Sequence, residues 1–236
     1  YDVENSINQA IGINSPTGFY AGKHQFLQNT VNLDFSKRIN QNFSLAFGGE
    51  YRYEQYKIGA GDEASYKGKG AESFVGFSPL NAVKGVRHSV AAYVDGELKF
   101  GDFTAHLAGR FENYSDFGST INGKLALRYE YAKGYSIRGA ISTGFRAPSL
   151  QQKYFSNSYT DLFVNGNGEQ VLVTKGIIRN ESDLSRELGL DKLKEEKSIN
   201  ASLGLTFRPT SKLFITLDGY FISVDDRIVL TSDITD

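Results

Sequence analysis

The chain of 236 residues contains no cysteine, methionine or tryptophan, and only four prolines. The absence of cysteine excludes a disulfide framework and thiolate metal sites. No apolar run approaches the roughly 20 residues that a membrane-spanning helix needs. The net charge of −1 provides no strong field that would attract nucleic acid or anionic lipid. Nucleic acid is therefore not an expected partner.

Glycine and aromatic residues are abundant instead, with 25 Gly, 14 Tyr and 17 Phe, a composition typical of β-rich proteins. The segment 135–146, YSIRGAISTGFR, shows the pattern most clearly. Its odd positions carry the bulky apolar side chains, and its even positions carry Ser, Ala, Gly and two arginines. This alternation predicts a β-strand with one apolar and one polar face, and Pro148 ends it.

The same alternation recurs along the chain and predicts about nine strands. They fall at residues 1–7, 26–37, 43–54, 86–100, 103–112, 121–131, 135–146, 199–207 and 213–221. The short connections lie near residues 40, 101, 133 and 210, and the longer ones at 8–24, 58–85, 113–120 and 151–194. Aromatic residues gather beside the short turns, as at a water–lipid boundary.

These observations predict an all-β fold, an antiparallel up-and-down meander that forms a transmembrane β-barrel segment with short turns on one rim and long loops on the other. A soluble all-β module that binds carbohydrate or another ligand is the alternative. It requires a dry protein core, whereas the barrel directs the same side chains to lipid. The residues that distinguish the two are Leu45, Phe47, Leu125, Leu203 and Leu217.

One part of the second long loop is expected to be helical. Residues 180–190, NESDLSRELGL, offer Asn or Ser as the N-cap, early acidic residues, and Gly189 as the stop. Leu184 and Leu188 are spaced for one helical face. We expect a short surface helix there.

Catalytic chemistry is not indicated. The three histidines lie far apart in sequence, and no Ser/His/Asp grouping supports an enzyme. Residues 165–169, NGNGE, lack the spacing of a calcium loop, so no metal or cofactor is predicted. The polar face carries charges of both signs that can pair across strands, or face the lumen of a wide barrel. The residues expected there are Glu50, Arg52, Arg87, Arg110, Glu112, Lys124, Arg128, Arg138 and Arg146.

The segment STGFRAPSLQQ (142–152) is similar to the FRAPS-type strand end of TonB-dependent outer-membrane receptors. Residues 108–131, 193–205 and 226–230 resemble neighbouring strands of that family in matching order. The resemblance implies a barrel of about 22 strands closed by an N-terminal plug. It also implies uptake of a scarce nutrient (an iron–siderophore, cobalamin or a glycan) across the bacterial outer membrane, powered by the inner-membrane TonB complex.

The chain shows no plug sequence and no energy-coupling box, and about nine strands are too few for such a barrel. We therefore expect residues 1–236 to be a partial barrel domain without its plug. Its expected partners are outer-membrane lipid, a small nutrient ligand, and the plug domain and TonB of the full-length protein. The lumen-facing charges would meet the plug. Ligand contacts are expected from aromatic residues of loops 58–85 and 151–194, namely Tyr66, Phe74, Phe77, Tyr154, Phe155, Tyr159 and Phe163.

Overall fold

The computed structural model describes the chain except residues 1, 5–7, 69, 71–74, 165 and 232–236. Two compact units are built from segments that alternate along the chain. Unit 1 comprises residues 1–28, 54–87 and 149–193, and unit 2 comprises residues 29–53, 88–148 and 194–236. No helix in the described part of the chain has the length and apolar character needed to span a membrane.

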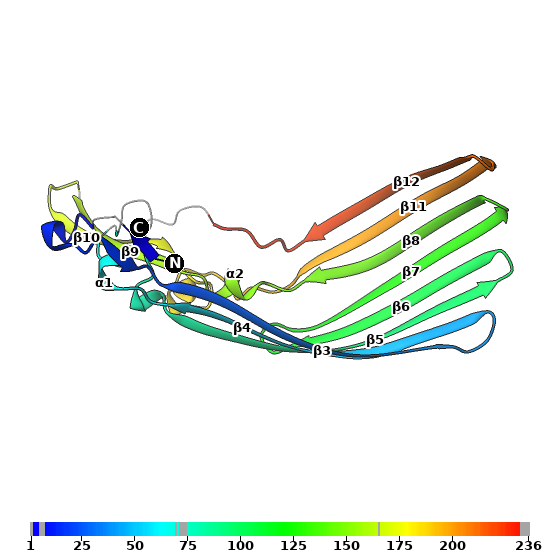
Figure 1. Ribbon diagram of the computed structural model, residues 1–236, viewed down its shortest axis with the longest axis horizontal. Coiled ribbons are helices and arrows are strands. Elements are labelled where there is room, and N and C mark those ends of the chain that lie inside the picture. Colours follow the sequence, from blue (N-terminus) through cyan, green and yellow to red (C-terminus); the bar gives the residue numbers. More distant parts are fainter. Residues whose placement is uncertain (1, 5–7, 69, 71–74, 165, 232–236) are drawn as a thin grey trace. The chain divides into compact units, whose positions relative to one another are not determined.

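Eight strands form the principal sheet, in the order β12-β11-β8-β7-β6-β5-β4-β3 (Figure 1). Their bounds are β3 (Lys23–Arg38), β4 (Phe43–Gly59), β5 (Val83–Phe100), β6 (Phe103–Tyr114), β7 (Gly118–Ala132), β8 (Tyr135–Arg146), β11 (Glu196–Thr210) and β12 (Leu213–Asp225). Strands that follow one another along the chain are neighbours in this sheet. The pairs β5–β6, β6–β7, β7–β8, β8–β11 and β11–β12 are antiparallel. The predicted up-and-down meander is therefore confirmed.

The tight turns follow the sequence expectation. Gly101 and Gly134 adopt positive φ angles of 58° and 83° in the β5–β6 and β7–β8 turns, a conformation that glycine adopts without steric cost. The expectation of a longer connection at residues 113–120 was wrong, because β6 runs to Tyr114 and β7 begins at Gly118. Within this hairpin Tyr114 stacks on Phe117 with ring centroids 4.6 Å apart.

The smaller elements belong mostly to the two long connections. They are β1 (Asp2–Glu4), η1 (Gly12–Asn14), β2 (Gly18–Tyr20), α1 (Glu63–Tyr66), η2 (Pro79–Asn81), α2 (Leu150–Tyr154), β9 (Asn157–Val164), β10 (Gln170–Ile177) and α3 (Asp183–Glu187). β9 and β10 form an antiparallel hairpin of their own, which alternation had not predicted. α3 is the expected short helix: the Ser182 hydroxyl accepts a hydrogen bond from the Ser185 amide at 3.2 Å and caps it.

Most of the bulky apolar side chains of the principal sheet are exposed. Phe47 is 49% exposed, Leu203 58% and Leu217 64%. Leu125 is also exposed and Leu45 is half-buried, so none of the five discriminating residues is sealed inside the protein. The dry core that a soluble module requires at these positions is not formed, and the outward orientation agrees with a barrel segment.

The apolar core lies instead in unit 1. It consists of Tyr56 and Ile58 from β4, Phe77 from the first long loop and Leu150 from α2. Val83, Tyr154 and Phe155 pack against this cluster. The long loops therefore fold back onto the polar-face side of β4 and bury apolar surface there.

Candidate functional site

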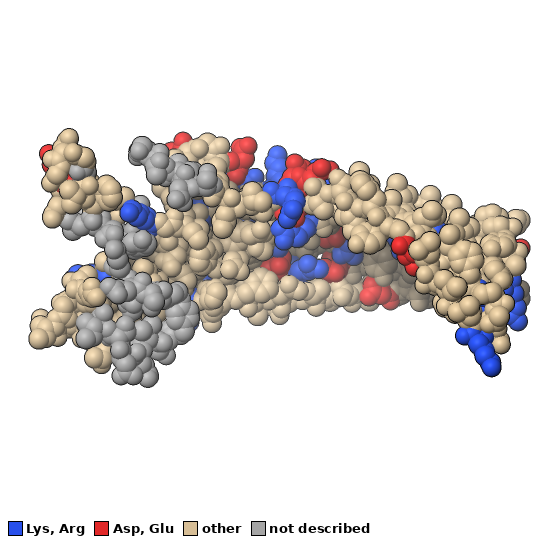
Figure 2. All heavy atoms as spheres, turned by 90° about the horizontal axis from the view of Figure 1, so that it is seen from above, with Lys and Arg blue, Asp and Glu red and all other residues tan. Residues whose placement is uncertain are grey.

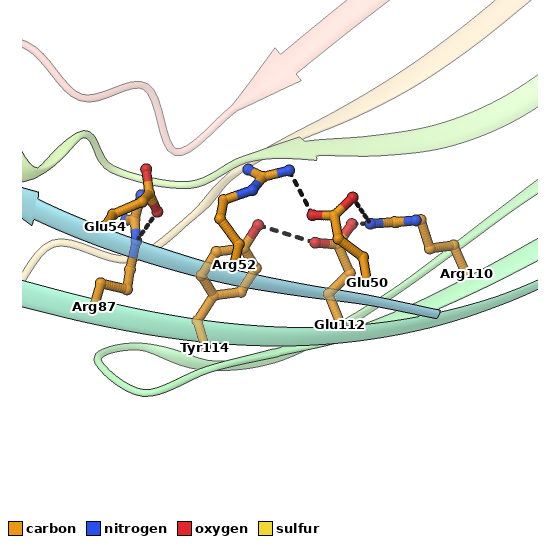
Figure 3. A network of polar contacts seen from close by, with 7 residues as sticks. All are labelled: Glu50, Arg52, Glu54, Arg87, Arg110, Glu112 and Tyr114. Carbon is orange, nitrogen blue, oxygen red and sulfur yellow. Dashed lines mark hydrogen bonds and ion pairs between the residues drawn. The ribbon is translucent and has the colours of Figure 1, made fainter. Parts of the chain in front are cut away.

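A chain of charged side chains crosses the polar face of unit 2 (Figure 3). The Arg52 guanidinium donates to Glu50 at 2.6 Å, and Arg110 reaches the other oxygen of Glu50 at 3.3 Å. Arg110 also donates through Nε to Glu112 at 2.6 Å, and the Tyr114 hydroxyl donates to Glu112 at 2.9 Å. Two cations and two anions alternate, so the cluster is charge-balanced and largely hydrogen-bonded.

Strand periodicity places these residues on one face, because Glu50 and Arg52 are two positions apart on β4, and Arg110 and Glu112 are two apart on β6. β5 lies between β4 and β6 in the sheet. In the register of β5 with β6, Ala91 stands opposite Glu112 and Tyr93 opposite Arg110, and Arg110 reaches Glu50 across β5. Figure 2 shows acidic and basic side chains gathered side by side on one face of the molecule.

A separate ion pair joins Glu54 and Arg87 in unit 1. Arg87 donates through Nε at 2.8 Å and through a terminal nitrogen at 2.7 Å to the same carboxylate oxygen. Both side chains are buried, at 5% and 8% exposure. Such a pair stabilises the fold only while both partners are present, because a lone buried charge is costly.

Arg138 makes a bridge across three strands. Its guanidinium donates to Asp218 of β12 at 2.5 Å and to Thr206 of β11 at 3.0 Å. Gly204 of β11 stands directly opposite both Arg138 and Asp218. A Cβ at Gly204 would lie 2.6 Å from Arg138 Nε, so the bridge requires glycine there.

Arg146 ends β8 and holds Glu196, the first residue of β11, in a two-pronged pair with distances of 2.8 and 2.7 Å. The amide of Ile228 donates to the same carboxylate at 2.8 Å. This contact ties the segment after β12 to the start of β11. The arginine of the FRAPS segment, Arg146, thus holds the end of β8 against the start of β11.

The remaining two polar-face predictions, Arg128 and Lys124, are also exposed. Arg128 pairs with Glu130 of the same strand at 2.7 Å, and Lys124 stands between Ala108 and Ser142 in the register. All nine predicted residues lie on the polar side of their strands. Contact with a plug domain stays a prediction.

The predicted ligand-binding aromatics occupy different environments. Phe77 is only 3% exposed and packs edge-to-face on Phe155, with centroids 6.1 Å apart, so it serves the core of unit 1. Tyr154 is half-buried and lies against Gly85, and Tyr66 is also half-buried. Phe163 is 51% exposed, and Lys175 Nζ stands 5.3 Å from its ring centroid. Phe74 and the side chain of Tyr159 lie outside the described residues.

Two polar pairs had not been predicted. Lys153 of α2 is buried and forms an ion pair with Glu181 at 3.1 Å, which joins two distant parts of the second long loop. No periodic signal marks Lys153, because its burial depends on how the loop folds. His106 Nε2 lies 2.7 Å from Asp95 on the polar face of β5 and β6, where strand parity places both residues without showing that they pair.

The family model described as TonB dependent receptor-like, beta-barrel, matches residues 2–236. Among solved structures, the siderophore receptor PirA from Pseudomonas aeruginosa shares 14% identity with a TM-score of 0.63, over 91% of this chain and 35% of that one. PirA from Acinetobacter baumannii shares 17% identity with a TM-score of 0.58, over 87% and 28% of the two chains.

The FrpB iron transporter from Neisseria meningitidis (F3-3 variant) shares 13% identity with a TM-score of 0.56, over 91% of this chain and 30% of that chain. The chain therefore spans about a third of the length of the solved structures that it matches. At these identities the likeness shows the fold alone. The family match over nearly the whole sequence shows more: this chain belongs to the TonB-dependent receptor β-barrel family, whose members are receptors of the bacterial outer membrane.

Proposed function

We propose that this chain is part of an outer-membrane receptor that binds a ferric siderophore and imports it with energy from the TonB complex. The family match over residues 2–236 is the observation that carries the proposal. The names of the similar structures, siderophore receptor and ferric enterobactin receptor, favour an iron chelate over cobalamin or a glycan. The protein acts by binding and transport rather than by catalysis.

Unit 1 supplies the candidate ligand surface. Phe163 is exposed and Lys175 stands over its ring, so the β9–β10 hairpin presents an aromatic plane beside a cation. An anionic chelate with aromatic rings can stack on such a plane and pair with the cation. Tyr66, Tyr154 and Phe155 are half-buried, and Tyr154 and Phe155 pack against the core cluster that contains Phe77. Phe74 and Tyr159 belong to the same proposal.

The polar face is proposed to meet the plug domain of the full-length receptor. Most of its charges are already paired with one another, as in the Glu50–Arg110–Glu112 series. A plug that slides or unfolds during transport therefore leaves these paired charges compensated on the barrel wall. The opposite, apolar face is proposed to contact membrane lipid.

A binding measurement on the full-length receptor tests the ligand proposal. Phe163→Ala should weaken binding of a radiolabelled ferric siderophore about tenfold, because one aromatic contact contributes about 1.4 kcal/mol. Phe100→Ala is the control, since Phe100 is also a solvent-exposed phenylalanine but lies beside a short turn. Unchanged binding across alanine variants of all the loop aromatics would remove the assignment.

A further inference from the structure

The connection between β9 and β10 contains a sequence that neither the fold nor the proposed function uses. Residues 165–169 read NGNGE, and the dipeptide Asn167–Gly168 of this turn lies entirely among the described residues. Another Asn-Gly dipeptide, Asn122–Gly123, lies within β7. Because the two dipeptides have the same chemistry, the structure around each of them decides how it reacts.

An Asn-Gly dipeptide reacts with itself when its backbone is free to bend, because glycine has no side chain to hinder the approach. The glycine amide nitrogen loses its proton to solvent and attacks the asparagine side-chain carbon Cγ. A bond forms between that nitrogen and Cγ, the Cγ–Nδ2 bond breaks, and the side-chain nitrogen leaves as ammonia. Water then opens the succinimide ring: cleavage at Cγ gives aspartate, and cleavage at the main-chain carbonyl carbon gives isoaspartate. Asparagine and water thus become a carboxylic acid and ammonia, with no oxidant or reductant.

The backbone around Asn167 permits this attack. Val164 and Gln170 are the last paired residues of the hairpin, and Asn167 and Gly168 lie in the connection between them, outside any strand. Both are solvent-exposed, and a Cβ at Gly168 would meet nothing within 4 Å. Gly168 has a φ of 81°, in the left-handed region that glycine adopts without steric cost. Its amide donates no hydrogen bond to any other described residue, so no internal partner holds the attacking nitrogen.

The backbone around Asn122 prevents the same attack. Gly123 stands opposite Gly109 in the register of β6 with β7. The amide of Gly123, which would be the nucleophile, donates a hydrogen bond to Thr143 Oγ1 at 3.1 Å. Ring closure would require Asn122 to leave its extended conformation and the ladder to open locally. Asn122 is therefore a protected reference within the same molecule.

We propose that Asn167 is a site of spontaneous deamidation at the tip of the β9–β10 hairpin, with water as the only co-reactant. The reaction replaces a neutral amide with a carboxyl group that is ionised at neutral pH. It therefore adds one negative charge to the hairpin as the protein ages. The modification follows from the position and conformation of the dipeptide, and it does not depend on the proposed function.

The new charge would arise beside the proposed ligand surface. Phe163 stands opposite Val171 near the turn, and Lys175 Nζ lies 5.3 Å from the Phe163 ring centroid. A carboxylate at position 167 opposes the attraction between this cation and an anionic chelate. Deamidation thus weakens ligand binding with time, a consequence that rests on the proposed function.

Peptide mapping of the full-length receptor tests the modification site. The folded receptor is incubated in detergent micelles in heavy-oxygen water at mildly alkaline pH and then digested, and tandem mass spectrometry assigns the products at each Asn-Gly dipeptide. Asn167 should deamidate at least about tenfold faster than Asn122, because β7 must open before Asn122 can react. The product at position 167 should contain isoaspartate as well as aspartate, since water opens the ring at either carbonyl.

The same measurement in urea shows whether the fold causes the difference. The two sites of the unfolded chain should react at rates within about threefold of each other, because no sheet protects either one. Equal rates in the folded receptor, or no reaction at Asn167, would overturn the proposal. A difference that persists undiminished in urea would also overturn it. Aspartate without isoaspartate at position 167 would overturn the succinimide route.

The effect of the charge is measured separately with Asn167→Asp. At low salt this variant should bind an anionic ferric siderophore about threefold more weakly than the wild type, and the difference should shrink at high salt. Asn167→Gln is the control, because it keeps a neutral amide and should bind as the wild type does. Equal affinity of Asn167→Asp and the wild type would overturn the effect on binding. Absence of siderophore binding by the wild type would instead remove the proposed function, while the mapping result still decides the modification site.

Discussion

At the residue level, the buried charges of unit 1 occur in pairs. Glu54 and Arg87 are both nearly excluded from solvent, and Arg87 places two donors on one carboxylate oxygen. Because desolvation of both charges is costly, such a pair contributes only modestly to the free energy of folding. Removal of one partner, however, leaves the other charge buried and uncompensated. The loss of folding stability on mutation therefore depends on which residue of the pair is changed and on whether both are changed together.

Arg87→Met should lower the free energy of unfolding by about 3–5 kcal/mol, because the Glu54 carboxylate loses its partner. The double variant Glu54→Leu/Arg87→Met should recover most of that loss. Urea unfolding of the full-length receptor in micelles measures both. Lys99→Met is the control, since the Lys99–Glu97 pair is exposed and should contribute less than about 1 kcal/mol. Equal losses in Arg87→Met and Lys99→Met would contradict this account.

At the element level, two long side chains bridge three strands by passing over a glycine. Arg138 of β8 passes Gly204 of β11 to reach Asp218 of β12. Near the other edge of the sheet, on the same polar face, the Tyr93 hydroxyl of β5 donates to Asp34 of β3 at 2.7 Å, and a Cβ at Gly48 of β4 would lie 2.7 Å from the Tyr93 ring. Each of these hydrogen bonds connects an edge strand of the sheet to the third strand counted from that edge.

Gly204→Val should displace Arg138 and lower stability by about 1–3 kcal/mol, the usual cost of overpacking. Gly219→Val is the matched control on β12, because a Cβ at Gly219 meets nothing within 4 Å. The control should change stability by less than about 0.5 kcal/mol. The same urea titration compares the two, and a loss in Gly219→Val as large as that in Gly204→Val would contradict the bridge.

Alternation in the sequence predicts the eight sheet strands because one face of each strand is apolar and the other polar. The β9–β10 hairpin escapes this pattern, since its exposed face mixes Phe163, Val171 and Lys175 without a clean period. The core position of Phe77 is likewise invisible, because it depends on a loop folding back onto β4. Local alternation therefore predicts the strands of the principal sheet. The structure of the long loops depends on tertiary contacts, which the local pattern does not show.

Strand parity also predicts which face the charged residues occupy, but not their partners. Arg110 of β6 reaches Glu50 of β4 across the intervening strand β5, so this contact depends on the register of all three strands. Arg138 finds Asp218 only because Gly204 lies between them. Pairing across two strands is a property of the assembled sheet, so sequence reasoning alone could not assign it.

At the scale of the whole molecule, the principal sheet is inverted relative to a soluble protein. Phe47, Leu127 and Leu217 are exposed, while Glu54, Arg87 and Glu112 are buried on the other face. Lipid on the apolar side and a polar lumen on the charged side satisfy both surfaces. The proposed contacts of the apolar face with lipid and of the charged face with the plug domain both depend on this orientation.

Site-directed nitroxide labelling of the full-length receptor in bilayers tests that orientation most directly, and the chain's lack of cysteine makes each introduced label unique within it. Leu127 and Arg128 are adjacent on β7 and point to opposite faces. A label at Leu127→Cys should be accessible to oxygen dissolved in lipid, and a label at Arg128→Cys to a water-soluble nickel chelate. If the Leu127 label met the chelate and the Arg128 label met lipid-dissolved oxygen, the account would be contradicted.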